Sequence, residues 1–437
     1  MEQGNASSTD PTPGPSARED AVTQARRARS RVLECEDELR AWVRLSQTWE
    51  EQALAIDGSA DRLPLRAVCV GVKDLIDVAG MPTRAGSSIT SADPVGQDAA
   101  CVARLRELGA VILGKTVTTE FGYFSPGPTR NPQALEHTPG GSSSGSAAAV
   151  GAGTVPLALG TQTAGSLTRP ASYCGTAGMV LAHGSTDLRG ITGLSESLDS
   201  LGLLTPSVAA LRRVLRAFGG LPEQEPAPVA HALIWDGACL EQIEPPMAAL
   251  IRELPDLLQR AGCRTAPLDW DDHVQTLAED HSVVMAFEAH RTRQQELELH
   301  GSSLSPQLRE LLERGRGIPS DAAGAALARR DRSREELAHH LGGDSVVVGP
   351  AAPGPAPAGL EATGSPALSR PWQLLGLPVV VVPGARTVAG LPLGAQLIGL
   401  PGQEEQLLEL GEMLEPLLRA LDPLPDSPAP VRKEMTC

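Results

Sequence analysis

Aromatic residues and lysines are scarce in this chain of 437 residues. Phe, Tyr and Trp together make up only 3% of the sequence, so the core must be built mainly from Ala, Val and Leu. Only three of the 37 basic residues are lysines, at positions 73, 115 and 433. An arginine keeps its proton at any working pH whereas a lysine can release it, so the two lysines inside the chain are informative.

The seven cysteines show none of the spacings that mark a metal site or a disulfide framework. They are scattered, odd in number and form no CxxC pair. This pattern is typical of reduced cysteines and predicts neither a zinc site nor a disulfide-stabilised fold. We therefore expect no metal and no cofactor.

The chain also lacks a basic, apolar start and any uncharged apolar run of about 20 residues, the length that spans a bilayer. Its net charge of −16 would repel nucleic acid and anionic membrane surfaces. The sequence thus predicts a soluble cytoplasmic protein whose partner is a small molecule, with no nucleic acid and no membrane. A homodimer is left open.

Strand-like and helix-like segments alternate over most of the chain. Apolar runs predict strands at residues 66–72, 111–113, 155–159, 178–182, 231–235, 345–349, 378–382 and 392–397. Amphipathic or small-residue segments predict helices at residues 21–45, 97–108, 143–153, 168–174, 206–218, 244–262 and 404–421. This alternation predicts an α/β layered fold with a largely buried mixed sheet.

Composition divides the chain into one folded region and two polar ends. Residues 1–20 are rich in Pro, Ser, Gly and acidic residues and are predicted to be disordered, and residues 422–437 are expected to form a flexible tail. Residues 21–421 are predicted to form one domain, in which residues 273–342 are a mainly helical excursion from the sheet. A surface connector is expected at residues 223–228.

Residues 138–178 are the most unusual stretch, because two clusters of glycine and serine flank a short apolar segment. Gly140 and Gly141 lead into Ser142, and a second turn ends at Ser166. Glycine allows a substrate to approach the main chain, so a serine between such glycines can be presented for chemistry. Taken singly, each serine is better explained as a turn or helix-cap residue.

This stretch resembles the signature of the amidase signature family of serine hydrolases. By that resemblance Ser166 is the nucleophile and Ser142 is the bridging serine. Lys73, in a Gly-Val-Lys-Asp segment, is the family's lysine. The three residues occur in the family's order, with 69 residues from Lys73 to Ser142 and 24 from Ser142 to Ser166. Three matched positions at such separations are far more specific than one serine motif.

The resemblance extends over nearly the whole chain and implies a fold. The segment GLPLGAQLIG at residues 390–399 is similar to the family's C-terminal pattern. Family members form a single α/β/α sandwich, in which helices cover both faces of a central mixed sheet. The resemblance also implies a cis peptide bond before Ser142.

A serine hydroxyl is a poor nucleophile until a base removes its proton, and a lysine can be that base only when neutral. Free lysine titrates near 10.4, but burial can lower this value by several units. Lys73 follows the apolar run AVCVGV, which would bury its amine. We hypothesise that Lys73 takes a proton from Ser142 while Ser142 takes one from Ser166, which attacks the carbonyl of the substrate.

The candidates for the oxyanion hole are the backbone N–H groups of Thr163, Ala164 and Gly165, in the turn before the nucleophile, and of Ser166 itself. Relatives usually carry glycine where Ala164 stands. If that position requires a positive φ angle, the alanine is strained.

Arg169 is the candidate for substrate binding. It lies three residues after Ser166, whereas many relatives carry an arginine two residues after their nucleophile. One turn of helix would bring its guanidinium to the pocket, where it could hold a substrate carboxylate in a bidentate pair. The alternative is a structural ion pair with Asp187 or Asp199, which is equally open. For Lys115 a structural role is predicted.

Three further segments are expected near the pocket. The cluster of Phe121, Tyr123 and Phe124 either walls the pocket or forms a local hydrophobic cluster. The proline-rich run at 349–359 is expected at its rim. Residues 178–190 lack the Lys-Pro pair that relatives carry, which indicates a remodelled loop beside the pocket.

The sequence therefore favours an amidohydrolase that cleaves a small amide through a seryl acyl-enzyme, with a carboxylate-bearing amide as the candidate substrate. One alternative is a component of a tRNA-dependent amidotransferase, which resembles this family and needs partner proteins. Another is a biosynthetic relative that forms an amide or cleaves an ester or carbamate.

Overall fold

The computed structural model describes residues 19–219, 221 and 227–426. Almost all of the segment predicted to be disordered, most of the predicted connector and residues 427–437 of the predicted tail lie outside the described residues. No helix of the described part is long and apolar enough to cross a membrane.

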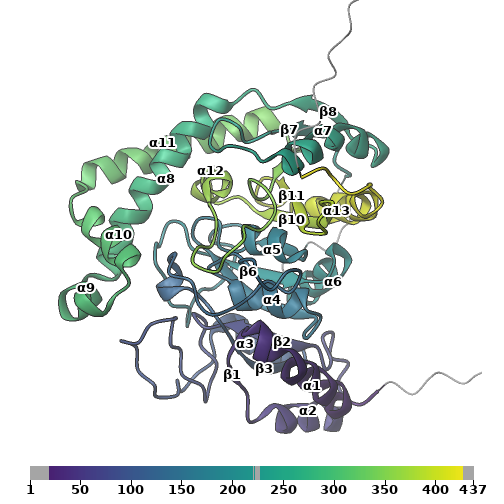
Figure 1. Ribbon diagram of the computed structural model, residues 1–437, viewed down its shortest axis with the longest axis vertical. Coiled ribbons are helices and arrows are strands. Elements are labelled where there is room, and N and C mark those ends of the chain that lie inside the picture. Colours follow the sequence, from purple (N-terminus) through teal and green to yellow (C-terminus); the bar gives the residue numbers. More distant parts are fainter. Residues whose placement is uncertain (1–18, 220, 222–226, 427–437) are drawn as a thin grey trace, which may run out of the picture.

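The described strands form one mixed sheet in the order β1-β3-β2-β4-β6-β5-β10-β11-β9-β7-β8 (Figure 1). Parallel pairs join β2 to β3 and β4, and β7 to β8 and β9, whereas the pairs in the middle are antiparallel. The strands are β1 (Trp42–Leu45), β2 (Cys69–Lys73), β3 (Val111–Thr116), β4 (Leu157–Gln162), β5 (Ala177–Val180), β6 (Ser200–Thr205), β7 (His231–Ile234), β8 (Arg264–Pro267), β9 (Ser345–Pro350), β10 (Val379–Arg386) and β11 (Pro392–Ile398).

Helices cover both faces of this sheet, as the resemblance implies. One face carries α3 (Ala100–Glu107), α6 (Val208–Phe218), α7 (Pro245–Arg260) and α13 (Glu404–Arg419). The other face carries α1 (Ala21–Leu39), α2 (Trp49–Gly58), α4 (Ser144–Gly151), α5 (Thr168–Cys174), α8 (Asp271–Thr292), α9 (Gln294–His300), α10 (Pro306–Arg316), α11 (Ser320–Leu341) and α12 (Arg370–Leu374). The predicted α/β/α sandwich is therefore confirmed.

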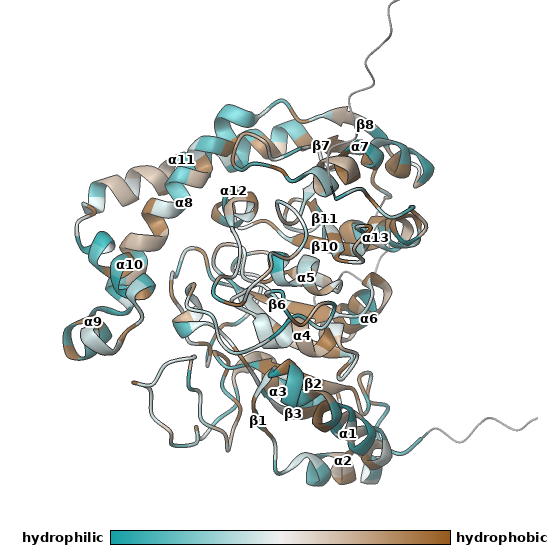
Figure 2. Cartoon of the chain, viewed as in Figure 1, coloured by the Kyte–Doolittle hydropathy of each residue, from teal (hydrophilic) through white to brown (hydrophobic). Residues whose placement is uncertain are grey.

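Two hydrophobic cores lie on the two faces of the sheet. In β10, Val379 and Val381 face the core beneath α4 and α5, while Val380 and Val382 face the core beneath α6 and α13. Successive side chains of a strand point to opposite faces, so a strand buried on both sides is apolar throughout. Figure 2 shows that the strands near β10 are hydrophobic, whereas the surface helix α1 is largely hydrophilic.

The predicted helix at residues 21–45 is too long. The chain adopts a left-handed conformation at Arg40 (φ 53°), which ends α1, and Trp42–Leu45 then pairs with β3 as an edge strand. Two further strands, β6 and β8, were not predicted. The strand β8 has only four residues, and β6 contains a glycine where strand patterns favour branched residues.

The helices α8 to α11 project from one side of the sheet, in the upper left of Figure 1. The longest two, α8 and α11, pack against each other, and α8 also packs against α10 and α12. This arrangement holds α8 over the turn that follows β4, where His281 bonds to Thr163.

Candidate active site

Lys73 is the last residue of β2, which lies between β3 and β4 in the sheet. The parallel pairing of Val72 with Leu159 brings the ends of β2 and β4 side by side. The Lys73 side chain is fully buried, and its Nζ lies 2.7 Å from Ser142 Oγ. It also donates to Thr161 Oγ1 (2.8 Å) and to the Thr161 carbonyl (3.3 Å). The three contacts fix the position of the amine.

Burial lowers the pKa of Lys73 to about 7, although the charge of Asp199 acts in the opposite direction. A buried ammonium loses its hydration, which favours the neutral amine. Near neutral pH a large share of Lys73 is therefore unprotonated and able to accept a proton.

Ser142 follows a cis peptide bond from Gly141, as predicted from the resemblance. Gly140 has a positive φ of 79°, and a Cβ there would meet the Cα of Pro170 at 3.1 Å, so only glycine fits. The N–H of Ser143 donates to the carbonyl of Ser166 (3.0 Å). This bond ties the loop before α4 to the turn that carries Ser166.

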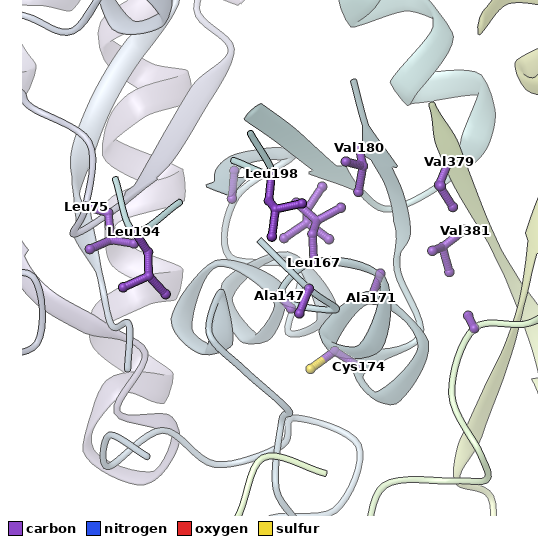
Figure 3. Close-up of a cluster of buried hydrophobic side chains, with 14 of the residues drawn as sticks. Leu75, Ala147, Leu167, Ala171, Cys174, Val180, Leu194, Leu198, Val379 and Val381 are labelled. Carbon is purple, nitrogen blue, oxygen red and sulfur yellow. The ribbon is translucent and has the colours of Figure 1, made fainter. Parts of the chain in front are cut away.

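Ser166 lies in the turn between β4 and α5. The side-chain oxygen of Gln162 accepts from the backbone N–H groups of Leu167 (2.9 Å) and Thr168 (3.1 Å), which braces the turn. Leu167 anchors it in the core near Ala171 and Leu198 (Figure 3). A Cβ on Gly202 of β6 would lie only 2.3 Å from Leu167 Cδ1, so the glycine in β6 leaves the room that Leu167 occupies.

The residues predicted for the oxyanion hole, 163–166, lie in this one turn. Among the described residues, no acceptor is found for the N–H groups of Thr163, Ala164, Gly165 and Ser166. Ala164 is not one of the described non-glycine residues with positive φ, so the alanine requires no strained backbone. The Thr163 hydroxyl donates to Asp199 (2.5 Å), which fixes the start of the turn.

One pocket brings both serines, the predicted oxyanion turn and Arg169 together. Of the predicted aromatic cluster, Tyr123 and Phe124 wall the pocket, with their rings 4.8 Å apart and nearly perpendicular. Its lining includes no residue of 178–190 or 349–359, and their predicted places beside the pocket and at its rim stay predictions. The complete lining is Gly122, Tyr123, Phe124, Gly141, Ser142, Thr163, Ala164, Gly165, Ser166, Arg169, Leu194, Met285, Thr363, Pro366 and Arg370.

Arg169 is 3% exposed and has no carboxylate partner in the described part of the chain. The alternative ion pairs are wrong, because Asp187 pairs with Arg189 (2.6 Å) and Asp199 accepts from Thr163. One Nη of Arg169 donates to the Gly141 carbonyl (2.6 Å), while its Nε and other Nη have no partner. Burial lowers the pKa of Arg169 to about 10.

Lys115 forms a buried ion pair with Asp74, at 2.9 Å. Asp74 directly follows Lys73 in the chain, and both partners are almost fully buried. Lys115 therefore neutralises a carboxylate next to the proposed base, in agreement with the structural role predicted for it.

His281 of α8 was not predicted from the sequence. Its Nε2–H donates to the Thr163 carbonyl (2.8 Å), and burial lowers the pKa of His281 to about 3, so the ring is neutral. Leu277, His281 and Met285 are spaced four residues apart and are all buried. Helical periodicity could have placed His281 on the buried face of its helix, but not next to Thr163.

Comparisons with known proteins agree with this geometry. The model of the Amidase family matches residues 26–408. The chain is 31% identical to a component of the glutamyl-tRNA(Gln) amidotransferase of Anaeromyxobacter sp. (strain K), over 84% of this chain and 85% of the relative.

Two solved structures are similar over most of their length. One is the crystal structure of an amidase, with a TM-score of 0.82, 30% identity and coverage of 92% of this chain and 97% of that one. The other is the peptide amidase of Stenotrophomonas maltophilia, with a TM-score of 0.73, 25% identity and coverage of 93% and 95%. With the match of the family model, these likenesses show that the chain belongs to the amidase signature family.

Proposed function

We propose that this protein hydrolyses a small amide through an acyl-enzyme on Ser166. The observation that carries the proposal is the 2.7 Å contact between the buried amine of Lys73 and Ser142 Oγ, beside Ser166 in one pocket. A buried base with a pKa of about 7 suits proton transfer at neutral pH.

The proposed reaction begins when neutral Lys73 accepts the hydroxyl proton of Ser142. Ser142 Oγ accepts the proton of Ser166, whose oxygen attacks the amide carbonyl carbon. The proton then returns through Ser142 to the amide nitrogen, the C–N bond breaks, and ammonia or an amine leaves. Water attacks the acyl-enzyme and gives its proton to the same relay. Ser166 regains a hydroxyl, and the carboxylic acid is released.

The turn from Ala164 to Ser166 supports the proposed oxyanion hole. Its N–H groups lack acceptors in the described structure, so they can donate to the oxygen on which negative charge develops. The hydrogen bonds from Thr163 to Asp199 and from His281 to Thr163 hold this turn before substrate binds.

Arg169 belongs to the proposal as a binding residue for a carboxylate on the substrate. Its unpartnered Nε and Nη are costly to bury, and an anionic group would satisfy them. All six cysteines in the described part are free, which supports a reducing, cytoplasmic setting.

The test is ammonia release from small primary amides by the native protein and by Ser166→Ala. We expect release by the native protein and its loss in the variant. Trapping of an acyl group on Ser166 by mass spectrometry would identify the intermediate. Equal release by both proteins would overturn the proposal.

A second candidate is a component of an amidotransferase complex, because the relative described above carries that name. In that case ammonia would pass to a partner protein instead of to solvent. Activity on glutamine that appears only in the presence of a co-purified partner would favour this candidate over free amide hydrolysis.

A further inference from the structure

The pocket beside Ser166 carries two arginines and no acidic residue. Arg169 and Arg370 line it, and no Asp or Glu is among the lining residues that the structure describes. The whole chain, in contrast, has a net charge of −16. The positive charge of the pocket is thus a local feature that opposes the charge of the molecule.

Arg370 begins α12, on a segment far from the signature in sequence. Its side chain is partly buried, its Nε is buried without a hydrogen-bond partner, and no carboxylate pairs with its guanidinium in the described structure. Glu241 is the acidic residue whose charge acts on Arg370, but the carboxylate of Glu241 accepts from Ser365 Oγ (2.5 Å). Arg314 adds a further positive charge near Arg370.

Arg169 and Arg370 are close enough for their charges to act on each other. Two guanidinium groups in one partly desolvated pocket repel each other, and a bound anion would remove this repulsion. Arg169 donates hydrogen bonds to Gly141 and Thr363, both of which line the pocket. Among the described residues Arg370 has no such hydrogen-bond partner, so its donors are available to a ligand.

We propose that Arg370, together with Arg169, forms an anion subsite that selects amides bearing a carboxylate and no ammonium group. The inference rests on the proposed function. Arg–carboxylate pairs are strong because the guanidinium donates two parallel hydrogen bonds. The substrate class is then the monoamide of a small dicarboxylic acid.

The same subsite discriminates against amino-acid amides. Asparagine is succinamate with an added ammonium group, and that group would meet two guanidinium ions and no carboxylate in the pocket. An unpaired cation in a positively charged, partly dry site is unfavourable. Asparagine and glutamine should therefore be poor substrates of the isolated protein.

The first experiment compares three amides that differ in one feature. Butyramide is neutral, succinamate carries a carboxylate, and asparagine carries both a carboxylate and an ammonium group. We expect kcat/KM to be about tenfold or more higher for succinamate than for either of the others. In Arg370→Gln the succinamate-to-butyramide ratio should fall by about tenfold, whereas the exposed control Arg252→Gln should keep the native ratio. A native ratio in Arg370→Gln, or asparagine as the best substrate, would overturn the subsite.

The second experiment separates this inference from the proposed function. Succinate binding to Ser166→Ala is measured by calorimetry, which requires no turnover. We expect binding that weakens by about tenfold in Ser166→Ala/Arg370→Gln. Succinate binding without hydrolysis of any amide by the native protein would support the anion subsite and contradict the proposed amide hydrolysis. Hydrolysis of butyramide by the native protein, with no succinate binding, would contradict the anion subsite and support the proposed amide hydrolysis.

Discussion

At the scale of single residues, Lys73 is the group on which the proposed chemistry depends most. Its position at the end of a buried strand was predicted from the apolar run before it, and burial lowers its pKa to about 7. The sequence did not reveal that Thr161 also holds the amine, because that contact joins residues 88 positions apart.

The pH dependence of amide hydrolysis follows from this lysine. Only the neutral amine accepts a proton, so kcat/KM should fall by about tenfold per pH unit below about pH 6. In Lys73→Met we expect a loss of about 10²–10⁴-fold at pH 8 and a residual rate without this acidic limb. Initial rates from pH 5 to 9 provide the check. If kcat/KM of Lys73→Met still falls in the same way below pH 6, another group causes that fall.

Lys115 supplies a prediction about stability. In Lys115→Met the carboxylate of Asp74 would remain buried without its cation, which should cost about 3–5 kcal/mol of unfolding free energy. The double variant Lys115→Met/Asp74→Asn removes both charges and should recover most of that loss. Urea unfolding at pH 7 compares the three proteins. A single variant as stable as the native protein would show that Asp74 is neutral or solvated.

At the scale of elements, α8 connects the helical projection to the turn that carries Ser166. Its buried His281 donates to Thr163, 118 residues earlier in the chain. The sequence predicts helical structure here but not which strand end the helix covers. That depends on packing between α8 and α12, which no local pattern encodes.

Replacement of His281 tests whether α8 positions the oxyanion turn. His281→Phe keeps a buried ring but leaves the Thr163 carbonyl without its donor, so kcat should fall about 5- to 100-fold while KM changes less. His273→Phe, at a half-buried position of the same helix away from Thr163, is the matched control. His281→Gln, which retains a donor, should recover part of the loss. Equal effects of His273→Phe and His281→Phe would indicate general damage to α8.

At the scale of the whole molecule, the sequence predicts the layers better than the strand inventory. Apolar runs and amphipathic helices predict the α/β layers and the buried sheet, because burial on two faces leaves strands such as β10 apolar throughout. The sandwich itself was implied by the family resemblance. The strand β6 was not predicted because it contains Gly202. This glycine is needed to leave room for Leu167, which belongs to another part of the chain. Arg370 was not predicted as a pocket residue because it comes near Arg169 only in the folded protein.

Burial of Lys73 also has a cost for the stability of the folded protein. The pKa of this lysine is about 7 when folded and near 10.5 when unfolded, so between these values the unfolded chain binds more protons. Above pH 10.5 the lysine is neutral in both states, so its burial costs no unfolding free energy that depends on pH. As pH falls from 10.5 toward 7, the unfolded chain takes up the proton and the unfolding free energy falls. The unfolding free energy of the native protein should therefore rise with pH by about 1.4 kcal/mol per unit relative to that of Lys73→Met.

Urea unfolding of the native protein and Lys73→Met at pH 7, 8 and 9 measures this difference. Tyrosines and cysteines that titrate in the same range affect both proteins alike, so their contributions cancel in the comparison. We expect the gap to change by about 1.4 kcal/mol per pH unit in favour of the native protein. Parallel stability curves would mean that Lys73 keeps its proton in the folded state. In that case it could not serve as the base for Ser142.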